Sequence, residues 1–318
     1  MELPSEPQIR WILRTTASLL QAGAEPVRGL VQPTGAYFPD AFDGSPASVA
    51  ALFRRIQAHA GLTDLEAEIN VAAPDGSVQK ASCGTGGCGG GGAIDAKLDR
   101  VARRSDGSYV IAVGAGEVRH STALTTALTR AMSLMFLIES GAAETIAARD
   151  VDATVDLTGT LLGFGVLLTN GSHIYSKACS GVHVQSATKM GVEELGLALG
   201  IFCELHEIPE RVAQKHLELT PREAFEEGSV WAASNRKIVK MLRSDPEAIA
   251  DDQYSIAESR SWLARALGIG KKKTSTPEEE LAQIEKWVAA PAAKKVIDPA
   301  KAARLAEIRA LMEETTES

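Results

Sequence analysis

Apolar residues in the first third of the chain follow helical spacing in two segments. Between residues 5 and 23 they recur every three or four positions, which predicts an amphipathic helix. A second such helix is expected from Pro46 to about Gly61. Ser45 is a suitable N-cap for it, proline is favoured at the first helical position, and glycine commonly ends a helix.

Strand-like patterns lie around these two helices. Residues 28–34, RGLVQPT, predict a short strand that runs into a loop, and residues 65–71, LEAEINV, alternate as a strand does. The segment 96–113 predicts two strands joined at Asp106-Gly107, a dipeptide typical of hairpin turns. Together these elements predict a small sheet near the N-terminus.

The pattern becomes mainly helical after residue 119. The predicted helices span 119–140, 149–170, 190–207 and 229–243. The fold class is therefore α+β, with a small N-terminal β-sheet followed by a helical bundle.

The last part of the chain differs from the rest. Glu follows both Ser255 and Thr276 after three positions, which is the pattern of a capping box at a helix start. Linker-like stretches separate the helices expected here, and their apolar stripes are thin. We predict a main domain over 1–244 and a helical C-terminal extension over 245–318, which either packs on the main domain or docks a protein partner.

Composition and charge narrow the class of protein. The chain has 318 residues, of which 45% are hydrophobic and 23% charged, as in ordinary soluble globular proteins. Its net charge of −8 argues against nucleic acid or an anionic membrane as a generic partner. The first residues are acidic and polar, and the longest uninterrupted apolar stretches, such as 161–168, are shorter than the ~20 residues of a membrane helix. A cytoplasmic location without membrane attachment is expected.

Three segments in order resemble one family. Residues 30–62 contain LVQPTGAYFPDAF before an amphipathic helix, 150–170 read DVDATVDLTGTLLGFGVLLTN, and 221–242 read PREAFEEGSVWAASNRKIVKML. These segments resemble bacterial cytoplasmic proteins with a zincin-like metallopeptidase core of the minimal gluzincin type. The resemblance covers about residues 7–243 and implies a zincin-like core.

The resemblance also implies where a zinc site would lie. Active zincins carry His-Glu-x-x-His on one helix, in which the two His bind Zn²⁺ and the Glu is the general base. The same register here places Thr129 and Ser133 at the ligand positions and Arg130 at the position of the base. On the second helix Asp152 stands at the third-ligand position, and Asp156 keeps the Asp that orients a ligand.

These substitutions remove the chemistry of a zinc peptidase. Hydroxyl groups are poor zinc ligands, and a guanidinium stays protonated, so it cannot act as a base. We therefore expect no metal at this site and an ion pair of Arg130 with Asp152 or Asp156. The leading hypothesis is an inactive pseudoenzyme that acts as a binding, scaffold or adaptor protein. An alternative is an enzyme other than a peptidase that uses Asp152, Asp156 and Arg130 in the old cleft.

The cysteines offer another alternative. Cys83 and Cys88 lie in the glycine-rich stretch 82–94, SCGTGGCGGGGAI. Together with Cys179 and His183 they would form a three-Cys, one-His set suited to tetrahedral zinc. Cys83 and Cys88 could instead form a reversible disulfide, or lie incidentally in a flexible insertion.

Overall fold

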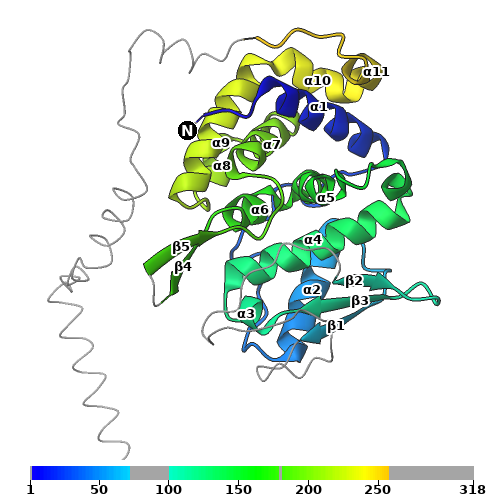
Figure 1. Ribbon diagram of the computed structural model, residues 1–318, viewed down its shortest axis with the longest axis vertical. Helices are drawn as coiled ribbons and strands as arrows, with labels where there is room; N and C mark the ends of the chain where they lie inside the picture. Colours follow the sequence, from blue (N-terminus) through cyan, green and yellow to red (C-terminus); the bar gives the residue numbers. More distant parts are fainter. Residues whose placement is uncertain (1, 72–99, 179–180, 258–318) are drawn as a thin grey trace, which may run out of the picture. The chain divides into compact units, whose positions relative to one another are not determined.

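The computed structural model describes residues 2–71, 100–178 and 181–257. Contacts divide the chain into two units, Met1–Gly270 and Lys271–Ser318, and all described residues belong to the first. This unit is α+β and mainly helical, with a small N-terminal sheet, as the sequence predicts (Figure 1).

The two N-terminal helices lie where the sequence predicts them, because their end signals act as expected. Helix α1 spans Glu6–Gln21 and helix α2 spans Pro46–Ala60. At the start of α2, the Ser45 hydroxyl accepts a hydrogen bond from the backbone N–H of Ser48. Gly61 ends α2 in the left-handed conformation that glycine adopts readily.

Three short strands form the N-terminal sheet. They are β1 (Ala67–Val71), β2 (Val101–Arg103) and β3 (Tyr109–Val113). Strand β3 lies in the centre, parallel to β1 and antiparallel to β2. The β2–β3 pairing confirms the predicted hairpin, and Gly107 takes the positive φ that its turn requires.

A long helix and a broken helix follow the sheet. The elements are α3 (Ala115–Val118), α4 (Ser121–Glu139), the 3-10 turn η1 (Ala142–Thr145), α5 (Val151–Gly159), the π-helical turn η2 (Thr160–Phe164) and α6 (Gly165–Gly171). The break is at Gly163, which has a φ of 98°. A Cβ there would collide with the carbonyl oxygen of Gly29, so a larger residue does not fit.

The strand predicted over residues 28–34 is absent, and that prediction is wrong. The segment is an irregular loop that lies against the helix break, where the Val31 N–H donates to the carbonyl of Gly163 at 2.8 Å. Leu30 and Val31 are both buried. Their apolar character therefore reflects a loop that covers a helix rather than a strand in a sheet.

A two-stranded antiparallel hairpin stands where the sequence analysis expects mainly helix. It consists of β4 (Ile174–Ala178) and β5 (Gly181–Gln185). The alternation of valine with polar residues over 182–185 is the signal that the sequence offered for a strand.

Five helices complete the described part of the chain. They are α7 (Val192–Leu205), α8 (Glu210–Gln214), α9 (Leu219–Ser234), α10 (Arg236–Ser244) and α11 (Pro246–Ala250). The helix predicted over 229–243 is wrong in its bounds, since the chain breaks at Asn235. The Asn235 side chain there accepts from the Ala257 N–H at 2.7 Å and donates to the Ala257 carbonyl at 3.2 Å.

Helix α11 is the described part of the predicted C-terminal extension, together with the residues that flank it up to 257. It packs against α1 and α10. The remainder of the extension, 258–318, lies outside the described residues.

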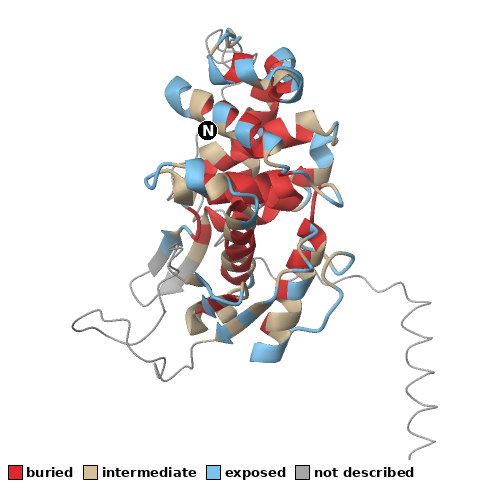
Figure 2. Cartoon of the chain, turned by 90° about the vertical axis from the view of Figure 1, so that its right-hand side faces the viewer, coloured by how far each residue is buried: buried red, intermediate tan, exposed pale blue. Residues whose placement is uncertain are grey.

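Two hydrophobic cores meet around the central helices. In the first core, Leu124, Leu128 and Met132 of α4 pack against α2 and the sheet. The second core is formed by α1, α5, α7, α9 and α10. Helix α4 lies between the sheet on one side and helices α5 and α6 on the other (Figure 1). Buried residues are concentrated in these central helices (Figure 2). The interface of α4 with α5 is thus deep inside the protein.

Two of the described helices, Ser121–Glu139 and Val151–Gly171, are long and apolar enough to cross a membrane by length and composition. In the fold, 61% and 83% of their most apolar windows are buried among other elements. Core helices of soluble proteins have the same character, and the unit has the architecture of a soluble-type α+β fold.

Candidate functional site

The candidate site lies where α4 packs against α5. Thr129 and Ser133 are one turn apart on the same face of α4, as their spacing requires, and both have zero exposure. The side chain of Arg130 is 3% exposed, and that of Asp156 on α5 has zero exposure. Polar groups at such depth need partners within the protein.

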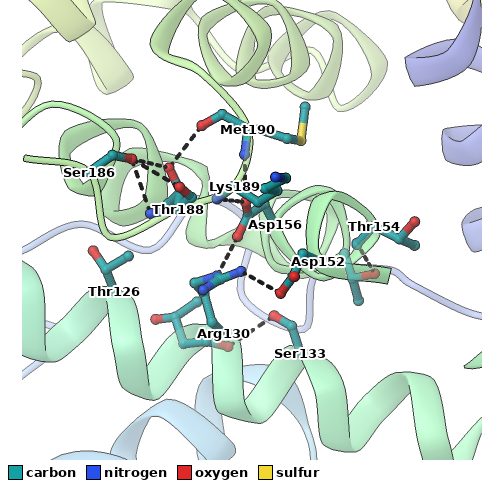
Figure 3. Close-up of polar contacts among 12 residues, drawn as sticks. Thr126, Arg130, Ser133, Asp152, Thr154, Asp156, Ser186, Thr188, Lys189 and Met190 are labelled. Atoms are coloured by element: carbon teal, nitrogen blue, oxygen red, sulfur yellow. Dashed lines mark hydrogen bonds and ion pairs between the residues drawn. The ribbon is translucent and has the colours of Figure 1, made fainter. Parts of the chain in front are cut away.

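Arg130 bridges the two helices. Its Nε donates to Oδ1 of Asp156 at 2.6 Å, and its Nη2 donates to Oδ1 of Asp152 at 3.3 Å (Figure 3). The predicted ion pair is therefore confirmed, and both carboxylates take part in it. The Asp152 side chain is 44% exposed, so only the contact with Asp156 is a buried charge pair.

Asp156 also holds the chain that precedes α7. Its Oδ2 accepts hydrogen bonds from the backbone N–H groups of Lys189, at 2.6 Å, and of Met190, at 2.9 Å. One carboxylate thus connects α4, α5 and this turn. Burial raises the pKa of Asp156, although Arg130 and the two N–H groups act in the opposite direction.

The turn over 186–190 has its own polar contacts. The Ser186 hydroxyl accepts from the Thr188 N–H at 3.2 Å, and the Thr188 hydroxyl donates to the carbonyl of Met190 at 2.9 Å. These bonds fix the backbone so that two successive N–H groups reach Asp156 (Figure 3). This part of the site could not be predicted from the sequence, since backbone donors carry no side-chain signal.

The residues present do not fit a zinc ion. The oxygens of Asp156 already accept three hydrogen bonds, and the two side chains on α4 at this interface are hydroxyl groups rather than the imidazoles that bind zinc well. The packing is also too close, because a Cβ on Gly159 would lie 2.7 Å from Ser133 Oγ and 3.4 Å from Thr129 Cγ2. The two helices touch where a pair of His ligands would need space.

The two hydroxyls on α4 differ in how well they are satisfied. Ser133 Oγ donates to the backbone carbonyl of Thr129 at 2.9 Å. Thr129 Oγ1 is buried and has no hydrogen-bond partner among the residues that the structure describes. Such a group costs free energy, so the hydroxyl of Thr129 does not stabilise the fold.

The cysteine hypothesis lies mostly outside the described residues. This applies to Cys83, Cys88 and Cys179, whereas His183 lies on β5, where it pairs with Ser176 of β4. Within the described ranges, no group of three or more His, Cys, Asp or Glu side chains could hold a metal ion. A zinc or thiol site at the glycine-rich stretch stays a prediction.

Comparisons of the chain with protein-family models, with curated proteins and with solved structures give no significant match.

Proposed function

We propose that this protein is a non-catalytic binding protein on a zincin-like scaffold, with a guanidinium in place of the catalytic metal ion. The observation that carries this proposal is the contact of Arg130 Nε with the fully buried Asp156 at 2.6 Å. A metal balances carboxylate charge in a zincin, and Arg130 supplies a positive charge at that point of the sequence register. In this proposal the protein acts in the cytoplasm as a scaffold or adaptor for a protein partner.

The chemistry of the site supports binding rather than catalysis. A guanidinium group is not a general base in proteins, so the residue at position 130 cannot activate a water molecule. The Asp156 oxygens are engaged with Arg130 and with two backbone N–H groups. Asp152 is the one partly exposed carboxylate of the ion pair, and its Oδ1 accepts a hydrogen bond from Arg130 Nη2 at 3.3 Å. These contacts argue against the alternative hypothesis of a non-peptidase enzyme that uses Asp152, Asp156 and Arg130.

The first experiment measures metal content and peptidase activity of the full purified chain. We expect less than about 0.1 zinc per chain associated with this site and no chelator-sensitive cleavage of a peptide library. If zinc is found, the double variant Cys83→Ser/Cys88→Ser shows whether these cysteines bind it, because the variant leaves residues 129–156 unchanged. Chelator-sensitive cleavage that persists in this variant would overturn the proposal.

A second experiment asks whether the metal site can be restored. The variant Thr129→His/Arg130→Glu/Ser133→His recreates the motif, but its imidazoles would collide with Gly159. We expect it to unfold at lower urea concentration than the wild type and to bind no zinc. Arg130→Lys is the matched control, since it keeps the positive charge. Tight zinc binding by the triple variant would contradict the packing argument.

A further inference from the structure

A cleft with a volume of about 400 Å³ lies at the C-terminal end of α7. Its walls come from α7, from the turn over 206–210 and from α10, and none of its residues belongs to the ion-pair site. The lining combines apolar side chains (Leu205, Ile208, Val239) with charged ones (Glu207, Glu210, Lys240). A cleft of this size fits a small molecule, and its polar groups define the chemistry of that molecule.

The charges in the cleft are of both signs. Glu204 and Arg236 also line it, but they pair with each other and so balance their charges. Glu207 and Glu210 leave negative charge on the turn, and Lys240 leaves positive charge on α10. No hydrogen bond or ion pair joins the side chains of these three to another residue in the described part of the chain.

A buried thiol lines the same cleft. Cys203 on α7 is 3% exposed and forms no disulfide within the part of the chain that the structure describes. Its thiol has no hydrogen-bond partner among the described residues. A buried free cysteine packs as a small apolar side chain, so Cys203 adds to the apolar part of the lining.

The turn itself is strained at one of the charged residues. Glu207 has a φ of 54°, in the left-handed region that residues other than glycine rarely adopt. The turn is held in this form by a hydrogen bond from the Ile208 N–H to the Cys203 carbonyl at 2.8 Å. This hydrogen bond and the left-handed residue form a common C-terminal turn of a helix, and they set where the backbone of Glu207 lies beside the cleft.

We propose that this cleft binds a free α-amino acid with an apolar side chain. Glu207 and Glu210 would receive the ammonium group, Lys240 the carboxylate, and the surface of Leu205, Ile208 and Val239 the side chain. The opposite charges select a zwitterion over a simple cation or anion. This site is separate from the proposed function, so either proposal can fail alone.

Isothermal titration calorimetry of the full chain with L-leucine tests the proposal. We expect a Kd of about 1 mM or tighter, and binding at least about tenfold weaker for isoamylamine and for 4-methylpentanoate. Each of these two probes carries only one of the two charged groups. A Kd for leucine and for other apolar amino acids weaker than about 1 mM would overturn the proposal, as would equal binding of the half-ligands.

Two variants and a labelling experiment locate the binding. Lys240→Ala and Glu210→Gln should each weaken leucine binding about tenfold, because each removes one charged contact. Their matched controls are Lys237→Ala and Glu226→Gln, which change exposed residues outside the cleft. Saturating leucine should also slow alkylation of Cys203, followed by mass spectrometry of its peptide. Unchanged affinity in Lys240→Ala, or unchanged alkylation, would show that leucine does not occupy this cleft.

Discussion

Two pairs of helices in this protein pack closely, one pair through glycines alone and the other beside a buried ion pair. Between α7 and α9, glycines bring the two backbones together, and a Cβ on Gly200 would lie 2.5 Å from the carbonyl carbon of Gly228. Between α4 and α5, Gly159 has the same role, yet the buried pair of Arg130 and Asp156 lies one turn away. Glycine alone is therefore enough for close approach, and packing does not explain the charges.

Burying two ions costs several kcal/mol each, and apolar residues of similar volume would serve packing at least as well. The charged contact is thus the unusual one of the two. The proposed history of the site accounts for it, because Asp152 and Asp156 would once have faced a metal and Arg130 now balances them.

Removing one charge should have the largest effect. Asp156→Ala would leave the buried guanidinium of Arg130 without its nearest carboxylate and remove the acceptor of the Lys189 and Met190 N–H groups. We expect a loss of about 3–5 kcal/mol in the free energy of unfolding, measured by urea denaturation. The double variant Arg130→Met/Asp156→Leu should recover most of this loss, because it removes both charges. A loss below about 1 kcal/mol for Asp156→Ala would contradict a buried ion pair.

Crowding the apolar contact should have a smaller effect. In Gly228→Ala the new Cβ would collide with the backbone of Gly196, so α7 and α9 must move apart. The expected loss is about 1–3 kcal/mol in urea denaturation. Glu226→Ala changes an exposed residue of the same helix and should stay within about 0.5 kcal/mol of the wild type. Equal stability of the two variants would mean that the helices are not in close contact.

High pH should lower the stability of the folded protein, because Cys203 on α7 carries a buried thiol. Burial raises the pKa of this thiol from its ordinary value of 9.0 to about 12, so the folded state keeps the proton at a pH where the unfolded state loses it. Stability from this group is fully present below pH 9 and falls as the pH rises towards 12. The loss is about 1.4 kcal/mol at pH 10. Cys203→Ala should lack this part of the pH dependence, and an identical profile would exclude a buried thiol.

The smallest expected effect is a gain in stability at the contact of α4 with α5. Thr129→Val keeps the shape of the side chain and removes a buried hydroxyl for which the described residues offer no partner. We expect about 1 kcal/mol of added stability. Ser133→Ala is the matched control and should lose about 1 kcal/mol, because that hydroxyl donates to the carbonyl of Thr129. Destabilisation by Thr129→Val would indicate that its hydroxyl is satisfied after all.

The parts that the sequence predicts well are those set by helical geometry. Residues 129, 130 and 133 share an interface because of their spacing. An ion pair of Arg130 with Asp152 or Asp156 is expected from the charges on two neighbouring helices, and the structure adds that both carboxylates take part. The hairpin over 101–113 and the ends of α2 follow from Asp-Gly, Ser-Pro and glycine signals.

Other parts depend on contacts between distant segments and could not be read from local pattern. The segment 28–34 is apolar because it covers a helix, and no local signal separates that from a strand. Lys189 and Met190 contribute backbone N–H groups, which any residue other than proline could supply. The break at Asn235 depends on the backbone of Ala257, which lies beyond the helix it interrupts.

The hydrogen bond from Val31 to Gly163 has a consequence for the order of assembly. The carbonyl at the helix break gains this partner only after the loop has closed across more than a third of the chain. Such long-range closure loses chain entropy before it gains contacts, and contacts of this kind slow folding. During synthesis, residues 28–34 leave the ribosome long before their binding surface exists. We therefore expect the seating of this loop to be a late step, which completes the core helix from outside.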